Sequence, residues 1–575
     1  MPATLSYPGV YIEEIPSGVR TITGVATSIA AFLGRAISGL VNEPITINSF
    51  GDFERQFGGL GVDYPMSYAV RDFYLNGGSQ AIIVRLYKDP VSPAEKTAKL
   101  TVGNLVLTAK SPGEWGKKLR ANIDLNVSNE FRMRLGLKTI DALFNLTIRF
   151  GNRSEKFLNV TVAESARRLN RVLIAESSLI DFVIPTTLPT VNAVADDSVT
   201  TKEQELVAKK VDWDKAQTDL AKAKAESPPD NTKIQTATAA EATAKTAFDK
   251  AITDITTEED AMNGSDGLVL DQTAYEGFKD KKTGLYALDK ADLFNLLCIP
   301  PDKREDDTNP AVYRKAMGYC KERRAMLIVD APSAWSANKD TAANTAKNGL
   351  ADLGLSGDTS RNAALYFPRV LQSDPLRNGQ IDKFVPCGII AGVMARTDTN
   401  RGVWKAPAGL DASVNGIQGL AVNLNDDENG MLNPLGINCL RAFPVNGRVV
   451  WGARTLRGAD QLADEWKYIP VRRTALFIEE SLYRGTQWVV FEPNDEPLWA
   501  QIRLNLGAFM HNLFRQGAFQ GSTPREAYFV KCDKETTTQN DINLGIVNIV
   551  VGFAPLKPAE FVVIKLQQMA GQIEV

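Results

Sequence analysis

Apolar and polar side chains alternate near the start of the chain. Residues 4–20 place Val10, Ile12 and Ile15 at apolar positions of a segment bounded by two prolines. Proline interrupts a helix and alternation has the period of a strand, so this segment is predicted to be an extended arm. An arm with so few residues of its own to pack against requires a partner.

Two later regions combine apolar runs with helical spacing. Between residues 24 and 87, the runs VATSIAAFLGRA, PITINSF and AIIVRLY predict strands, and YPMSYAVRDFYLNGG predicts a helix that ends at its glycines. Residues 291–335 repeat the order, with a strand at DLFNLLCIP, a helix from Pro310 to Arg324 and a strand at AMLIVDAP. A strand, helix, strand order predicts a parallel sheet.

The middle of the chain has a different pattern. Residues 98–190 contain KLTVGNLVLTAK, LRANIDLNVS, FRMRLGLK and FNLTIRFG, which we interpret as short strands of an inserted, mainly β domain. Residues 202–256 are rich in Ala, Lys, Thr and Asp and are broken by ESPPDN, which predicts a helical hairpin. Its seam positions are Leu206, Trp213 and Leu220 in the first limb and Ile234, Ala237, Ala244, Phe248, Ala251 and Ile255 in the second, interrupted by Glu241. The hairpin is either a decoration that contacts a partner or a solvated insertion with no dedicated role.

The C-terminal part predicts two helices and two closing strands. One helix covers Trp466–Leu482, and a second covers Pro497–Gln516 with apolar residues on one face. The strands are LGIVNIVVGFAP and AEFVVIKLQQ. The predicted fold class is therefore α/β (α+β) and multi-domain, with a central α/β body built from both N- and C-terminal parts. The predicted division is an N-terminal arm (1–20), the N-terminal part of the body (21–97), the inserted β domain (98–200), the helical hairpin (201–262), an α/β domain (263–400), a C-terminal domain (401–554) and a C-terminal arm (555–575).

Composition excludes several classes of function. The chain has 575 residues, of which 44% are hydrophobic, and 65 Lys plus Arg against 68 Asp plus Glu give a net charge of −3. This balance argues against disorder, and no overall positive charge is present to bind nucleic acid or anionic lipid. No secretion signal or membrane span is visible, so we expect a protein made in the cytosol that does not insert into membranes.

Candidate chemistry is sparse. The single histidine, His511, and five widely spaced cysteines with no Cys-x-x-Cys pair predict neither a metal site nor a disulfide framework, and no cofactor is expected. Phosphate-loop, nucleophile-elbow and zinc-helix motifs do not occur in the sequence. Asp330, at the end of a predicted parallel strand, is where an α/β enzyme would place an acid, but a single Asp there is a weak signal, and we interpret it as a structural cap or ion-pair partner. His511 is interpreted as a packing residue.

Several longer segments are distinctive. They are YPGVYIEEIPSG, GVATSIAAFLGRA, SPGEWGKKLRANI, GVMARTDTNRGVWKAPAG, NPLGINCLRAF, VWGARTL, EWKYIPVRRTALFIEESLYRGTQWVVFEPNDEPLW, FVKCD and PLKPAEFVVIKLQQ. Together they resemble the contractile tail sheath family of phages and phage-derived injection machines. Both ends of the family pattern lie in one chain, which is similar to a phage tail, an R-type bacteriocin or an extracellular contractile injection system. The region from 98 to 290 matches far less, apart from SPGEW.

The resemblance implies many copies of this chain stacked as rings around an inner tube, and contraction that drives the tube through a target cell envelope. It implies baseplate and sheath-terminating cap proteins as further partners, and assembly in the bacterial cytoplasm into a phage tail or a phage-tail-like particle. The arms are expected to complete sheets on neighbouring copies. The residues expected to exchange strands are Val10, Tyr11, Ile12, Phe561, Val562, Val563 and Ile564.

A helix of the C-terminal domain is expected to contact the inner tube, because this domain lines the sheath lumen in the family. The candidates are Arg503, Arg515 and Arg525, facing acidic residues of the tube, although ordinary solvated or intramolecular arginines are the competing interpretation. Two other functions are alternatives to a contractile sheath. One is a static tail or tube protein, and the other is an α/β enzyme that uses Asp330.

Overall fold

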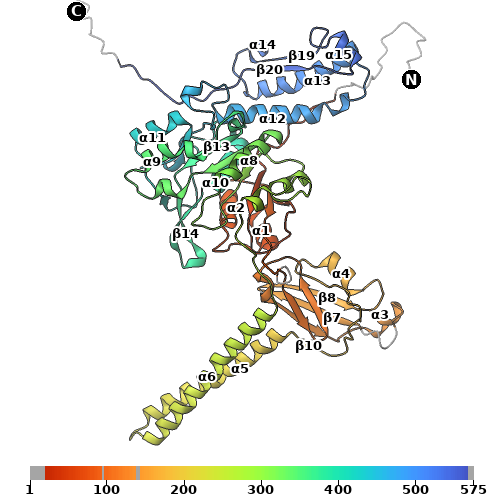
Figure 1. Cartoon of the computed structure of the whole chain (residues 1–575), viewed down its shortest axis with the longest axis vertical. Helices are drawn as coiled ribbons and strands as arrows, with labels where there is room; N and C mark the ends of the chain where they lie inside the picture. Colours follow the sequence, from red (N-terminus) through yellow and green to blue (C-terminus); the bar gives the residue numbers. More distant parts are fainter. Residues whose placement is uncertain (1–19, 93–95, 138–142, 567–575) are drawn as a thin grey trace, which may run out of the picture.

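The computed structural model describes residues 20–92, 96–137 and 143–566. An eight-stranded sheet organises the centre of the chain, in the order β18–β17–β13–β12–β11–β1–β3–β2 (Figure 1). Its strands are β1 (Ala30–Gly34), β2 (Ile45–Ile47), β3 (Ala81–Arg85), β11 (Leu296–Cys298), β12 (Met326–Asp330), β13 (Ala363–Phe367), β17 (Ile437–Phe443) and β18 (Gly447–Val450). The strands from β17 to β3 run parallel, and antiparallel β18 and β2 form the two edges.

Helices cover both faces of this sheet, as its uninterrupted apolar strands require. In β1, Ala31 and Leu33 belong to one core and Ala30 and Phe32 to the other. The first core is completed by α7 (Gln272–Glu276), α8 (Pro310–Glu322) and α9 (Ala342–Gly349), and the second by α1 (Phe50–Phe57), α2 (Pro65–Leu75) and α10 (Cys387–Arg401). The predicted parallel unit of residues 291–335 is confirmed as β11, α8 and β12, with β11 and β12 parallel.

The pairing of β1 with β11 joins segments that are far apart in sequence. Ala30 is in register with Leu296 on one side and with Ala81 on the other. The N-terminal part and the central part of the chain therefore form one sheet, across the region from 98 to 262. Helices α2 and α10 pack so closely that a Cβ on Gly388 would lie 2.0 Å from the Ala69 carbonyl oxygen, so only glycine fits there.

Residues 98–197 form two antiparallel sheets around a separate core. The strands are β4 (Lys99–Val102), β5 (Leu105–Ala109), β6 (Leu119–Asp124), β7 (Phe144–Phe150), β8 (Arg153–Val160), β9 (Ile180–Asp181) and β10 (Ala195–Asp196), and α4 (Leu169–Glu176) packs on them. The strand expected at FRMRLGLK is wrong, because this segment begins inside a short helix, α3 (Asn129–Arg134). Ser128 caps α3 by accepting the Phe131 amide at 3.3 Å, and none of the α3 side chains is buried, so the alternation there does not reflect a sheet.

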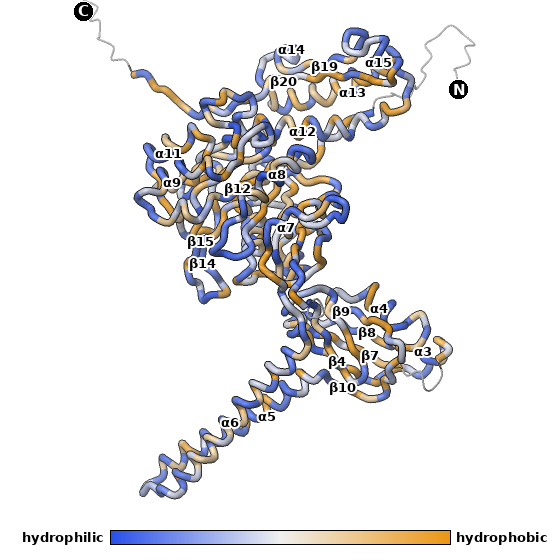
Figure 2. Tube along the Cα trace, in the orientation of Figure 1, coloured by the Kyte–Doolittle hydropathy of each residue, from blue (hydrophilic) through white to orange (hydrophobic). Residues whose placement is uncertain are grey.

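Two long helices, α5 (Ser198–Ala225) and α6 (Asn231–Ala261), project together from the β region (Figure 1). Most of their residues are exposed, and hydrophilic and hydrophobic positions are mixed along both helices (Figure 2). The Trp213 and Phe248 rings stack at 5.1 Å between centroids, and the Trp213 indole N–H donates to Glu241 Oε1 at 2.6 Å. Glu241, the residue that interrupts the apolar seam, is therefore the hydrogen-bond partner of the largest seam side chain.

A polar joint connects this β region to the body. The Arg85 side chain, which is 1% exposed, donates to backbone carbonyls of Ala36, Ile37 and Gly39 in the body and of Pro112 in the β region. Pro112 belongs to the SPGEW motif. The next residue, Gly113, has φ +132°, and a Cβ there would lie 3.0 Å from a body carbonyl oxygen. The SPGEW segment is therefore the turn at which the two units meet.

A three-stranded sheet and a short helix flank the central sheet. The strands are β14 (Val370–Asp374), β15 (Gln380–Phe384) and β16 (Gly419–Leu420), with β14 in the middle, and the helix is α11 (Asp426–Leu432). Strands β17 and β18 lie beyond residue 401 yet belong to the central sheet. Parallel pairing of β17 with β13 therefore carries the central sheet to Val450, past the predicted domain boundary at 401.

The remaining residues form a C-terminal unit with its own core, above the body in Figure 1. It contains α12 (Ile469–Gly485), α13 (Glu496–Arg515), α14 (Pro524–Ala527), β19 (Tyr528–Lys531), α15 (Gln539–Asn543) and β20 (Val550–Phe553). The first described residues pack on this unit, since the Arg20 amide donates to Asn505 at 3.2 Å and the Val25 amide to Ser481 at 3.2 Å. The first described residues of the chain are therefore attached to the unit that its last helices form.

Candidate functional sites

Asp330, the candidate acid, serves as a buried cap. Its Oδ1 accepts the backbone amide of Cys387 at 2.9 Å, and Cys387 is the first residue of α10. The Asp330 Oδ2 atom is buried and accepts no hydrogen bond from any described residue. A carboxyl group at a helix N-terminus compensates unpaired amides and the helix dipole. The structure therefore favours the capping role over catalysis, and Asp330 does not line the cleft of about 990 Å³ between residues 401–453 and 556–562.

The environment of Asp330 makes its charge costly. Burial raises the pKa of its carboxyl from 3.8 to about 7. A raised acid pKa means that the folded chain keeps a proton that the unfolded chain releases, so this group lowers stability progressively as the pH rises from about 4 to about 7. We expect Asp330→Asn to be more stable than wild type above pH 7, with an advantage that grows by up to about 1.4 kcal/mol per pH unit across that window. Urea unfolding between pH 4 and pH 8 measures this, and a loss of stability at pH 8 would contradict it.

The other candidate chemistry is not assembled. His511 is exposed, with its ring centroid 6.2 Å from that of Phe514 and 6.5 Å from that of Tyr528. It is therefore less buried than expected from its interpretation as a packing residue. All five cysteines are buried and unpaired. Within the described ranges, no group of His, Cys, Asp and Glu side chains has the geometry of a metal site. Of the helices in those ranges, none has the length and apolar character needed to cross a membrane.

The expected strand-exchange residues divide into two groups. Val10, Tyr11 and Ile12 lie outside the described residues. The second group is described, and the strand expected at AEFVVIKLQQ does not form within the chain, because residues 559–566 have no sheet partner among the described residues. The side chains of Phe561, Val562, Val563 and Ile564 are 75–81% exposed. The described end of the chain therefore leaves the body as an apolar, unpaired segment (Figures 1 and 2).

The C-terminal unit carries a small sheet beside this segment. Strands β19 and β20 pair only with each other among the described residues, with Tyr528 opposite Phe553 and Lys531 opposite Val550. Phe529 and Val550 on them are 55% and 45% exposed. Each strand keeps one free edge, and a two-stranded sheet is marginally stable by itself.

The structure separates the three candidate arginines. Arg503 faces its own unit, where its guanidinium pairs with Glu496 at 2.6 Å and donates to the Cys532 carbonyl. Arg515, at the end of α13, and Arg525, in α14, are exposed. Arg503 and Arg515 are twelve positions apart on one helix, which at 100° per residue turns them about 120° from each other. They cannot contact one flat surface together.

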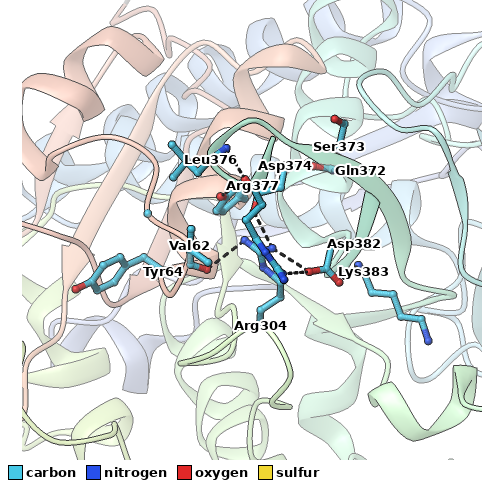
Figure 3. Close-up of polar contacts among 12 residues, drawn as sticks. Val62, Tyr64, Arg304, Gln372, Ser373, Asp374, Leu376, Arg377, Asp382 and Lys383 are labelled. Atoms are coloured by element: carbon cyan, nitrogen blue, oxygen red, sulfur yellow. Dashed lines mark hydrogen bonds and ion pairs between the residues drawn. The ribbon is translucent and has the colours of Figure 1, made fainter. Parts of the chain in front are cut away.

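A buried ionic network, which sequence reasoning missed, fixes the β14–β15 hairpin to the body (Figure 3). Arg304 pairs with Asp374 at 2.8 Å and with Asp382 at 3.0 Å, and also donates to the Val62 carbonyl at 3.1 Å. The Tyr68 hydroxyl donates to Asp374 at 2.8 Å. The side chains of Arg304 and Asp374 are 6% and 0% exposed, so both ions have been removed from water and depend on each other.

Comparison with known proteins gives a consistent result. Residues 277–456 match the model of the phage tail sheath protein central domain, and residues 463–568 match that of the phage tail sheath C-terminal domain. A tail sheath protein of Vibrio phage KVP40 is 31% identical over 134 residues, which are 23% of this chain and 20% of that protein. A protein of Pseudomonas aeruginosa described as a prophage major tail sheath protein is 26% identical over 289 residues, which are 49% of this chain and 67% of that protein. The chain thus matches a fifth of the first relative's length and two thirds of the second's.

Solved structures extend the likeness over nearly the whole fold. The helical sheath of the anti-feeding prophage in its contracted state aligns with a TM-score of 0.53 at 22% identity, covering 98% of this chain and all of that chain. The baseplate of the same particle aligns with a TM-score of 0.52 at 22% identity over 99% of this chain and all of that chain. A sheath tail protein from Listeria innocua aligns with a TM-score of 0.54 at 13% identity over 93% of this chain and 96% of that chain. At these identities the structural likeness concerns the fold.

Proposed function

Because this chain belongs to the contractile phage tail sheath family, we propose that it is the structural subunit of a contractile sheath. Copies stack as rings around an inner tube, and contraction of the stack drives the tube through a target cell envelope. The observation that carries this proposal is the described part of the C-terminal arm, in which Phe561–Ile564 are apolar and 75–81% exposed in a single chain. Such a segment is stable in water only when another chain covers it.

The acceptor for the arms is the β19–β20 sheet of a neighbouring copy. Its free edges accept main-chain hydrogen bonds, and an added strand turns a marginal two-stranded sheet into a stable one. At about 0.5–1.5 kcal/mol net per hydrogen bond, four to six ladder bonds contribute several kcal/mol per junction. The packing of Arg20–Val25 on α12 supports the same location for the N-terminal arm, with Val10, Tyr11 and Ile12 as its pairing residues.

Contraction then requires two packings of the same subunit. The arms keep neighbours connected, and the globular bodies exchange one set of polar contacts for another. A subunit does work only through the difference in free energy between its contacts in the two lattices, so no nucleotide is needed at the moment of firing. The chain acts as a structural protein and not as an enzyme, and the buried, capping position of Asp330 supports that assignment.

The inner tube is contacted by the end of α13 and by α14. Arg515 and Arg525 are exposed there, and we assign them to acidic groups of the tube. Arg503, which sequence reasoning placed beside them, has its guanidinium engaged by Glu496 and by a carbonyl of its own unit, so it is the weakest of the three candidates.

Charge reversal at these positions tests the tube contact. We expect Arg515→Glu with Arg525→Glu to reduce assembly on purified tubes by about tenfold or more, because each reversal replaces an attraction by a repulsion. Arg503→Glu is the matched control on the same helix. It should lower the monomer's free energy of unfolding by more than it weakens the free energy of binding to tubes. Pelleting of sheath with tubes over a salt series measures both, and unchanged pelleting of the double variant would remove the assignment.

Further partners are baseplate and cap proteins at the two ends of the sheath. We place assembly in the bacterial cytoplasm, into a phage tail or a phage-tail-like particle, with no direct contact to nucleic acid and no membrane insertion by this chain. We also propose that the β domain and the α5–α6 hairpin are insertions into the sheath body, and that the chain divides into the predicted arms and domains. We assign the hairpin to the periphery because most of its residues are exposed.

Electron microscopy of the purified chain with tubes tests the proposed function. A contractile sheath forms hollow striated cylinders with two pitches, a long one before and a short one after triggering. A static tail or tube protein forms cylinders of one pitch, and an enzyme remains monomeric. Either of those last two results would overturn the proposal.

A further inference from the structure

The C-terminal arm is attached to the body at one charged residue. Glu560 receives two parallel hydrogen bonds from Arg454, from Nε to Oε1 at 2.8 Å and from Nη2 to Oε2 at 2.6 Å, and the Tyr468 hydroxyl donates to Oε2 at 3.1 Å. The Arg454 side chain is 0% exposed, and that of Glu560 is 16% exposed. A bidentate guanidinium–carboxylate pair in this environment is both strong and directional.

Arg454 is itself held at the edge of the central sheet. Its backbone amide donates to Asn438 Oδ1 at 2.7 Å, and Asn438, which lies in β17, returns a hydrogen bond to the Arg454 carbonyl at 2.7 Å. The remaining Arg454 donor, Nη1, binds the Gly458 carbonyl at 3.1 Å and Asp460 at 2.9 Å. The ion pair therefore links the arm to the eight-stranded sheet, and Tyr468, the residue before α12, holds the same carboxylate from the C-terminal unit.

Exposure changes abruptly after this contact. Between β20 and Glu560 the chain is mostly half-buried, and from Phe561 to Leu566 every described residue is exposed. Residues 556–562 form one wall of a cleft of about 990 Å³, so the cleft wall continues two residues past Glu560. Trp404, Trp451 and Gln516 line its other walls, so the arm passes along a gap between the body and the C-terminal unit, and Glu560 fixes it within that gap.

We propose that the Arg454–Glu560 ion pair fixes the point at which the C-terminal arm leaves the subunit, so that tension from a neighbouring copy enters the central sheet at Arg454. This inference rests on the proposed function, because it requires the arm to be held by a neighbour. The mobile part of the connection then begins at residue 561. Without the pair it would begin after Pro555, which bridges to Phe519, and the connection would lengthen by about five residues, or roughly 17 Å of extended chain.

The attachment is tested first in the monomer. Spin labels are placed at Ala559→Cys and Asp411→Cys, which are exposed while all five native cysteines are buried. We expect a narrow distribution of distances between the two labels in the labelled wild type. In Glu560→Ala the distribution should be about twofold broader, because Arg454 loses its partner and no longer holds the arm. Glu560→Gln, which can still accept from Arg454, should lie between them. Lys557→Ala is the control on the same arm, and equal widths in all four proteins would overturn the proposal.

The transmission of tension is tested in the assembled sheath. Wild type and Glu560→Ala are assembled on tubes and triggered, and continuous contracted sheaths are counted by microscopy. We expect the fraction that remains continuous to fall by about tenfold in Glu560→Ala, because the longer connection no longer pulls neighbouring bodies into register. Equal fractions would overturn the proposal even if the arm is looser in the monomer. Failure of the wild type to form a sheath would instead contradict the proposed function.

Discussion

Truncation of the chain after Glu560 is expected to give a folded monomer that no longer forms a sheath. The large apolar side chains from Phe561 to Leu566 are 75–94% exposed, so their removal takes almost no contact away from the monomer. Unfolding free energy should therefore change by no more than about 0.5 kcal/mol. Each lost junction removes several ladder bonds, and a loss of about 4 kcal/mol corresponds to about a thousandfold weaker contact. Because every subunit in the lattice uses the same junction, assembly should be abolished.

Two further truncations test which arm residues connect neighbouring copies. Truncation after Leu566 keeps Phe561–Ile564 and should retain most assembly, whereas deletion of residues 1–15 should abolish assembly as the C-terminal truncation does. Thermal unfolding reports the fold of each monomer, and sedimentation with tubes reports assembly. Normal sheath from the chain that ends at Glu560 would show that these apolar residues do not connect neighbours.

The elements governed by local pattern could be predicted from the sequence. The unit of β11, α8 and β12 follows from apolar runs that flank a helix beginning at a proline. The seam of the α5–α6 hairpin follows from its seven-residue spacing, and the predicted seam positions are the less exposed ones. The prediction of a strand at FRMRLGLK is wrong, because alternating side chains on an exposed segment carry no information about burial. The Ser128 cap instead favours a helix there.

The polar connections could not be predicted, because their partners are distant in sequence and ordinary in composition. Arg454 lies 106 positions from Glu560, and Arg304 lies 78 positions from Asp382. Both Arg454 and Glu560 fall inside segments that resemble the sheath family, VWGARTL and PLKPAE, but nothing in either segment identifies the other. The extension of the central sheet past the predicted boundary at 401 has the same cause, since the parallel pairing of β17 with β13 is decided by contacts across the sheet.

Replacement of Arg304 by methionine is expected to cost about 3–5 kcal/mol of unfolding free energy, the typical effect of removing one partner from a buried ion pair. Asp374 and Asp382 would face each other without the guanidinium between them, and the Tyr68 and Phe384 rings would lose the cation that lies 5.0 Å and 4.6 Å from their centroids. Arg377→Met is the matched control, because Arg377 pairs with Asp382 from a position that is 37% exposed and should cost less than about 1 kcal/mol.

The cost of Arg304→Met should depend on pH in a defined direction. Burial acts to raise the pKa of Asp374, but hydrogen bonds from Tyr68, Leu376 and Arg304 outweigh it and hold the pKa below its usual 3.8. A lowered acid pKa contributes stability above the unfolded value, and that stability is lost as the pH falls through the folded value. Without Arg304 its part of this contribution disappears, so the deficit should be largest near neutral pH and should shrink below about pH 4.

A second substitution separates charge from packing at this site. In the Arg304→Met background, Asp374→Asn removes the carboxylate that has lost its partner, and it should recover part of the lost stability at pH 7 but little at pH 4. Chemical unfolding of the wild type, the two single variants Arg304→Met and Asp374→Asn, and the double variant at both pH values gives the coupling free energy between the two positions. A deficit no larger than that of Arg377→Met, or one independent of pH, would mean that packing and not the buried charge holds the β14–β15 hairpin. If the predicted coupling is found, the hairpin is a rigid part of the body, and movement in contraction is left to the arms.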